Sequence, residues 1–137
     1  MFGLKKDESL YNKALRFSCL DQDIASMPLG DQTMVEEGAL NLSGGQRTRI
    51  CLARVIYADR PILLLDDPLS SLDLRVIHKV VENLSILSKS DGKTIILTTH
   101  HVNSLAVCDR CIEVSFGRTN LMTIAQFLEN RQKNLAH

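Results

Sequence analysis

A run of four aliphatic residues that ends in two acids is the feature that most constrains the fold of this chain. Ile62 to Leu65 contains no polar residue, and Asp66 and Asp67 follow it directly. A run of this length is typical of a short strand. Because it does not alternate with polar residues, we expect both of its faces to be buried, as in the centre of a parallel sheet. Such sheets bind ligands at the carboxyl ends of their strands, where the two acids lie.

Two further apolar runs and the segments between them predict an α/β fold. The runs cover residues 94–99 and 111–116, and helical spacing is found around 74–87 and 102–107. Strands that alternate with helices indicate βαβ units and a parallel sheet. We also predict helices over 7–20 with Asp7 as N-cap, over 46–57 behind Ser43 as N-cap, and over 122–132, with an ordered connector over 28–41.

Composition and charge exclude several classes of function. The 137 residues are 45% hydrophobic and 23% charged, as in globular domains. Sixteen basic and sixteen acidic residues give a formal net charge of zero, so there is no summed positive field for nucleic acid or anionic lipid. No apolar run approaches the roughly 20 residues of a membrane-spanning helix. Residues 1–7 lack the features of a secretory signal, so the cytosol is the expected compartment.

The four cysteines are expected to be reduced in that compartment. Cys108 and Cys111 form a C-x-x-C, and together with His100 and His101 they offer the ligand types of a zinc site. A C-x-x-C without a second paired motif is a weak zinc signal. We therefore favour a structural role, with Cys111 at the start of a half-buried strand.

The helix predicted over 46–57 follows Ser43 and a glycine pair, Gly44 and Gly45. Backbone N–H groups at a helix N-terminus attract anions, glycines allow a phosphate to approach closely, and the Ser43 hydroxyl adds a hydrogen-bond donor. A helix that needed only a cap would not need two glycines, each of which lowers helix propensity by ~1 kcal/mol. The pattern favours an anion site.

The acids after the first strand permit two interpretations. Two adjacent carboxylates at a strand tip suit a divalent cation and a phosphate, and His100 ends the next strand. Paired acids also occur as ordinary strand-terminating caps, which is the more frequent case for Asp66 and Asp67 taken alone. The neighbouring glycine-led helix shifts the balance toward a phosphate site.

One further pattern is excluded as a phosphate-binding loop. Such a loop requires G-x-x-x-x-G-K-[ST] between a strand and a helix. At the only Gly-Lys-Thr, residues 92–94, Leu87 stands where the first glycine belongs, and an apolar strand follows. We predict a turn over 90–93 instead.

Together these motifs resemble ATP-binding-cassette proteins. The sequence from Leu42 to Gln46 is similar to the family signature, and its order and spacing relative to Asp66-Asp67, to 70–73 and to His100 match that family. The resemblance covers nearly the whole chain. The connector 28–41 and the stretch 65–73 are similar to the multidrug-resistance-associated subfamily (subfamily C), and the first of its two cassettes is the closer match.

The resemblance implies a fold, cofactors and partners. The fold is a P-loop-NTPase-like parallel sheet with flanking helices, truncated at the N-terminus. Residues 1–42 are expected to be a remnant of the helical signature subdomain and 43–137 the C-terminal part of the cassette core. ATP and Mg²⁺ are the implied cofactors. The implied partners are a second nucleotide-binding domain in a head-to-tail pair and the transmembrane domains of an exporter, at the cytoplasmic face of a membrane.

The resemblance also implies residue roles. The signature that meets the γ-phosphate of ATP held on the partner domain consists of Leu42, Ser43, Gly44, Gly45 and Gln46. The D-loop that crosses the dimer seam contains Ser71 and Asp73. Asp66 reaches Mg²⁺, Asp67 takes the position of the catalytic base, and His100 is the switch histidine that senses the γ-phosphate.

Three departures from the family pattern matter. Asp67 stands where most cassettes have a glutamate, and because it is one methylene shorter we expect slow hydrolysis. Glu36 and Ala39 replace glycines that usually precede the signature, which affects the expected loop conformation. The P-loop and the glutamine loop are absent, and the resemblance places both before Met1.

These departures leave more than one function open. We favour a part of an exporter that is inactive alone, with the apolar faces of the 62–65 strand partly bare and marginal stability. The alternative is a non-catalytic module that docks on another cassette and regulates it. DNA-repair ATPases with similar motifs fit less well, because the chain has no sustained heptads.

Overall fold

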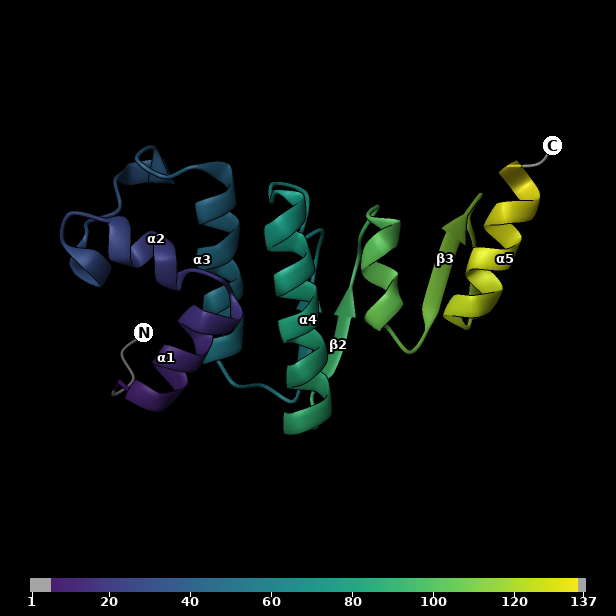
Figure 1. The fold of residues 1–137 in the computed structure, drawn as a ribbon, viewed down its shortest axis with the longest axis horizontal. Helices are drawn as coiled ribbons and strands as arrows, with labels where there is room; N and C mark the ends of the chain where they lie inside the picture. Colours follow the sequence, from purple (N-terminus) through teal and green to yellow (C-terminus); the bar gives the residue numbers. More distant parts are fainter. Residues whose placement is uncertain (1–5, 136–137) are drawn as a thin grey trace. The chain divides into compact units, whose positions relative to one another are not determined.

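A computed structural model describes residues 6–135, which divide into two compact units at His100 and His101. In chain order, the first unit contains α1 (Glu8–Phe17), α2 (Asp21–Ser26), two 3₁₀ turns (Gly30–Gln32 and Glu37–Ala39), α3 (Gly44–Tyr57), β1 (Ile62–Leu65), α4 (Leu74–Asp91) and β2 (Thr94–Leu97) (Figure 1). The second contains a 3₁₀ helix (Val102–Val107), β3 (Cys111–Ser115), β4 (Arg118–Met122) and α5 (Ile124–Leu135). The subdomain boundary predicted after residue 42 lies inside the first unit and stays a prediction.

The parallel pairing of β1 with β2 confirms the predicted α/β fold and sets the position of the strand ends. Ile62 pairs with Thr94, and Leu65 pairs with Leu97. Beyond the last pair, the Thr98 amide donates to the Leu65 carbonyl at 3.0 Å. Because the two strands run in the same direction, the residues that follow Leu65 and Leu97 lie at one edge of the sheet.

The prediction that β1 is buried on both faces is wrong for the described residues. Leu63 and Leu65 are 2% and 7% exposed, whereas Ile62 and Leu64 on the other face are 57% and 70% exposed. Ile96 of β2 is 52% exposed as well. One face of the sheet carries the core and the other is uncovered, which confirms the expectation that an apolar face is partly bare.

The core of the first unit is built mainly on α4. This helix begins at Asp73, whose carboxylate accepts hydrogen bonds from Arg75 N and Val76 N, and it ends at Gly92 in the left-handed region (φ 64°). It extends beyond the predicted 74–87. Its buried residues recur at helical spacing and cluster with buried side chains of α1, α3 and the segment 65–72; they are Ile77, Val80, Val81, Leu84 and Leu87.

The N-terminal helices agree only in part with the prediction. Asp7 caps α1 as predicted, by accepting a hydrogen bond from Leu10 N. The helix ends at Phe17 rather than residue 20, because Cys19 takes a positive φ of 58°. The short helix α2 was not predicted, since six residues without a side-chain cap carry too little periodicity.

A tyrosine ties the predicted connector 28–41 to α1. The Tyr11 hydroxyl donates to Asp31 at 2.9 Å. Burial, reinforced by this hydrogen bond, raises the pKa of Tyr11 to about 12. The connector is therefore ordered against the helical part of the first unit.

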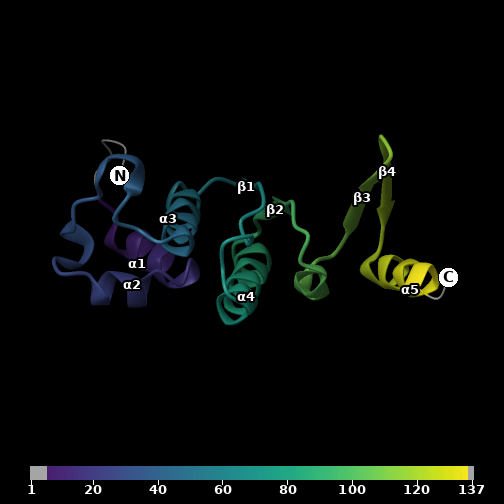
Figure 2. The same cartoon turned by 90° about the horizontal axis from the view of Figure 1, so that it is seen from above.

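The second unit corrects the prediction for the third apolar run. β3 does not join the parallel sheet but pairs antiparallel with β4, from Cys111 opposite Met122 to Ser115 opposite Arg118 (Figure 2). Phe116 and Gly117 form the connecting turn with φ values of 48° and 72°, as in two-residue hairpins. α5 begins at Ile124 instead of residue 122, because Met122 ends β4 and the Thr123 hydroxyl accepts from Gln126 N at 3.3 Å.

Two further helical features complete the description. The segment 102–107, predicted as helical, forms a 3₁₀ helix. Within residues 6–135, no helix has both the length and the apolar composition needed to cross a bilayer.

Ala39, which stands where the related family usually has a glycine, adopts a glycine-like conformation with φ 56°. Ala39→Gly is expected to raise stability by about 0.5–1 kcal/mol. Relief of a left-handed conformation is worth about 1–2 kcal/mol and outweighs the roughly 0.4–1 kcal/mol of added unfolded-state entropy. The denaturant midpoint of the chain measures this. Ala25→Gly, on the exposed side of α2, serves as control and should lower the midpoint. A lower midpoint for Ala39→Gly would contradict the expectation.

Candidate functional site

The start of α3 is a capping box with an open end. Gln46 N donates to the Ser43 hydroxyl at 3.1 Å, and Ser43 N donates to Gln46 Oε1 at 2.9 Å. These two bonds satisfy the N-cap and third amides, while the amides of Gly44 and Gly45 have no intrahelical acceptor at this end of a helix. Ser43 is exposed. The geometry suits an anion, as the sequence predicted.

The loop of residues 67–73 packs against this helix start. The hydroxyls of Thr48 and Ser71 lie 2.5 Å apart, and Ser71 Oγ donates to the Gly44 carbonyl at 3.4 Å. Two leucines of the loop are buried in the core, Leu69 at 0% and Leu72 at 8% exposure. The predicted D-loop therefore lies beside the predicted signature of the same chain.

Gly45 is needed for this packing. A Cβ at Gly45 would lie 3.1 Å from the Ser71 carbonyl oxygen and 3.2 Å from Arg49 Nη1, both closer than an ordinary contact. A Cβ at Gly44 would lie 3.6 Å from Ser71 Cβ, an ordinary van der Waals distance. Packing within this chain therefore requires a glycine at position 45, in addition to the phosphate approach that the sequence indicated.

A second cluster lies at the carboxyl ends of β1 and β2. Thr98 Oγ1 donates to Asp66 Oδ1 at 2.8 Å and accepts from the Asp67 amide at 2.8 Å. His100 Nδ1 lies 3.5 Å from Asp67 Oδ1. The structure therefore brings together Asp66, Asp67 and His100, which the sequence had grouped, and places Thr98 between the two acids.

The environment of each acid differs. Asp66 is exposed, whereas Oδ1 of Asp67 is shielded from solvent and has no hydrogen-bond donor within the described residues. Asp67 also takes a positive φ of 43°, and its carbonyl accepts from the Ser70 hydroxyl at 3.1 Å. Backbone outliers of this kind often occur at functional sites. Asp66 is therefore the carboxylate open to a cation, whereas Asp67 Oδ1 faces His100 Nδ1.

A divalent cation would need ligands from outside this cluster. In the described part of the chain, no group of three or more His, Cys, Asp or Glu side chains gathers around a point. Mg²⁺ is commonly held by one or two carboxylates together with phosphate oxygens and water. The exposed Asp66 fits that kind of site.

The Gly-Lys-Thr and the C-x-x-C are two further sequence patterns that the structure describes. Lys93 of the Gly-Lys-Thr is 8% exposed and donates to Asp59 at 2.6 Å and to the Arg60 carbonyl at 3.0 Å. The strand β2 follows it, as predicted. Cys108 and Cys111 are free thiols, and burial raises the pKa of each.

Two predicted residues remain: Asp73 acts as the N-cap of α4, and Leu42, which is half-buried, directly precedes the Ser43 cap. Sequence reasoning missed four residues that support the clusters: Asp23, Thr48, Arg49 and Thr98. A signal existed only for Thr98, which lies two residues before His100 at a strand end. The others lie in helices, and only their partners in space distinguish them.

Comparisons with known proteins point to one family. The family model described as "ABC transporter" matches residues 6–70. The chain is 42% identical over 122 residues to an ABC-type transporter of Zymoseptoria tritici, a match that covers 89% of this chain and 9% of that protein. It is 37% identical over 126 residues to ATP-binding cassette sub-family C member 3 of Homo sapiens, covering 89% and 8%. The chain thus spans about a tenth of the length of these curated relatives.

A solved structure shares the fold. The structure of a bacterial Atm1-family ABC exporter with ATP bound matches with a TM-score of 0.80 at 25% sequence identity. The match covers 91% of this chain and 22% of that one.

The glycine pair provides a matched test of the packing at the α3 start. Gly45→Ala is expected to be less stable than Gly44→Ala by about 1–2 kcal/mol, because both gain helix propensity but only Gly45→Ala forces the Ser71 carbonyl to move. Urea unfolding of the two variants measures the difference. Equal stability of the variants would contradict the packing described above.

Proposed function

Because this chain belongs to the ATP-binding-cassette transporter family, we propose that the start of α3 binds the γ-phosphate of an ATP held by a second nucleotide-binding domain. The two domains would pair head to tail. In the parent protein, hydrolysis of that ATP drives export across a membrane. The C-family relatives support this reading, although each is many times longer than this chain.

The observation that carries the proposal is the open capping box. The backbone amides of Ser43 and Gln46 each donate to the side chain of the other residue. The Gly44 and Gly45 amides have no such acceptor and point out of the N-terminal end of the helix. Anionic oxygens are stabilised by such amides and by the helix dipole. The exposed Ser43 hydroxyl, which accepts from Gln46 N, keeps its own proton for a phosphate oxygen.

The acids at the strand ends would serve a second nucleotide. Asp66, oriented by Thr98, fits as a ligand of Mg²⁺, which would neutralise phosphate charge when bound. Asp67 and His100 would orient an attacking water or accept a proton from it, and the 3.5 Å separation of Asp67 Oδ1 and His100 Nδ1 supports a joint role. Because an aspartate reaches less far than a glutamate, this half of the pair would hydrolyse ATP slowly.

The parent protein supplies the remaining partners. We propose that transmembrane domains of an exporter hold the cassette at the cytoplasmic face of a membrane, and that nucleic acid is no partner, given a formal net charge of zero.

A charge placed at the cap tests the phosphate site without removing the cap. Aspartate and asparagine both cap helices well. Ser43→Asp is therefore expected to keep the fold but to weaken ATP-dependent association with a P-loop-bearing C-family cassette by about tenfold or more, because it sets a carboxylate against the γ-phosphate. Ser43→Asn, the control, should lose at most a few-fold. Association is measured with ATP and with ADP. Equal binding of the partner in ATP and in ADP by the unaltered chain would argue against the proposal.

The chain without its partner makes a second test. It is expected neither to bind ATP tightly nor to hydrolyse it, because no P-loop is found in its sequence. Phosphate release from the purified chain measures this. Turnover that is abolished by Asp66→Asn would contradict the expectation.

A further inference from the structure

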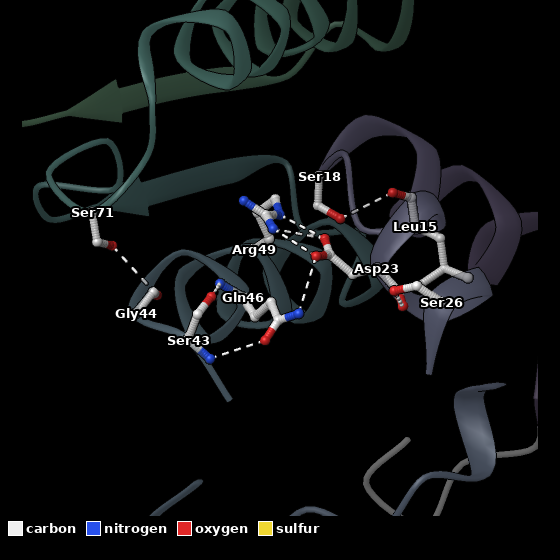
Figure 3. A network of polar contacts seen from close by, with 9 residues as sticks. All are labelled: Leu15, Ser18, Asp23, Ser26, Ser43, Gly44, Gln46, Arg49 and Ser71. Atoms are coloured by element: carbon white, nitrogen blue, oxygen red, sulfur yellow. Dashed lines mark hydrogen bonds and ion pairs between the residues drawn. The ribbon is translucent and has the colours of Figure 1, made fainter. Parts of the chain in front are cut away.

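An aspartate of α2, Asp23, accepts hydrogen bonds from two side chains at the start of α3. Asp23 Oδ1 accepts from Gln46 Nε2 at 3.2 Å and from Arg49 Nη2 at 2.8 Å, and its Oδ2 accepts from Arg49 Nε at 2.9 Å (Figure 3). The side chains of Asp23 and Arg49 are 16% and 12% exposed. One half-buried carboxylate therefore holds two side chains of the first turns of α3.

This contact determines which way the Gln46 amide faces. A glutamine amide has a donor side and an acceptor side, and a carboxylate accepts but does not donate. With Nε2 turned toward Asp23, Oε1 is turned toward the Ser43 amide, where it accepts the capping bond of 2.9 Å. The reversed amide would set its oxygen against the carboxylate and lose both bonds.

Arg49 in turn holds the Asp23 carboxylate in one orientation. The guanidinium holds both oxygens of Asp23 in a bidentate pair, which adds directional restraint to the ionic attraction. Its Nη1 lies beside Gly45, where a Cβ would be only 3.2 Å away. Within α2, the Ser26 hydroxyl donates to the backbone carbonyl of Asp23 at 2.8 Å and stabilises this short helix (Figure 3).

We propose that Asp23 is a positioning residue for phosphate binding: it orients the Gln46 amide, and through it the Ser43 cap and the adjacent glycine amides. This inference rests on the proposed function of the α3 start. Asp23 itself does not touch the phosphate in this scheme. Its effect is on how well ordered the phosphate-binding amides are before the nucleotide arrives.

The isosteric variant Asp23→Asn tests the orientation. Asparagine keeps one acceptor oxygen but replaces the other with an NH₂ group that would face the Arg49 Nε donor, so the bidentate pair and the negative charge that fix the oxygen accepting from Gln46 are lost. We expect hydrogen-exchange protection of the Ser43 and Gln46 amides to fall about tenfold, and ATP-dependent association with the P-loop-bearing cassette to weaken by a similar factor, the scale of a charge-assisted hydrogen bond. The control Asp21→Asn removes the same charge from an exposed position of the same helix and should change neither.

A charge-swapped double variant separates positioning from plain stabilisation. Asp23→Arg with Arg49→Asp rebuilds an ion pair, but arginine has no acceptor, so the Gln46 amide must turn its oxygen toward position 23. We expect the swap to recover the unfolding temperature lost by Asp23→Arg alone, without recovering amide protection or ATP-dependent association. Recovery of all three would overturn the inference and leave only a structural ion pair.

The two readouts also separate this inference from the function on which it rests. Unchanged protection of Ser43 and Gln46 in Asp23→Asn overturns the inference, whatever the association data show. If the unaltered chain shows no ATP-dependent association, the proposed function fails. A selective loss of protection would in that case still support the orienting role of Asp23 at the cap.

Discussion

The contact between the first turn of α3 and the loop 67–73 is the constraint on which the site depends. The Ser71 carbonyl approaches the α3 backbone so closely that a Cβ at Gly45 would lie 3.1 Å away. Leu69 and Leu72 anchor the loop in the core, and its first residue, Asp67, donates its amide to Thr98. The helix start and the acids at the end of β1 are therefore held in relation to each other by one short, well-packed segment.

The polar groups of the site are ordered by reciprocal hydrogen bonds more than by burial. Ser43 and Gln46 bond each other, Thr98 bonds both Asp66 and Asp67, and Asp23 bonds both Gln46 and Arg49. Each bridging group uses a donor and an acceptor, or two acceptors, so its orientation is determined. Side chains that are oriented in this way lose little further entropy when a ligand binds, which favours a preorganised phosphate site.

The prediction succeeded where the signal is local and failed where it is not. β1, the start of α3 and the N-cap of α1 follow from residues within one turn or one run. The burial of both faces of β1 did not, because it depends on which other elements cover the sheet. β4 was missed because Arg118 to Met122 has little apolar alternation, and its pairing follows from the turn at Phe116 and Gly117.

The sequence by itself determined the family, the fold class and the principal residues of the two clusters, Ser43 to Gln46 and Asp66, Asp67 and His100, because caps and motifs rest on spacings of a few residues. It also excluded Gly92 to Thr94 as a phosphate loop, since a strand follows. Only the tertiary structure decided how those residues are oriented. Thr98 meets Asp67 across 31 positions of sequence, and Arg49 meets Asp23 across 26. Such bonds exist because parallel strand pairing and helix packing bring distant segments together, and no local pattern specifies them.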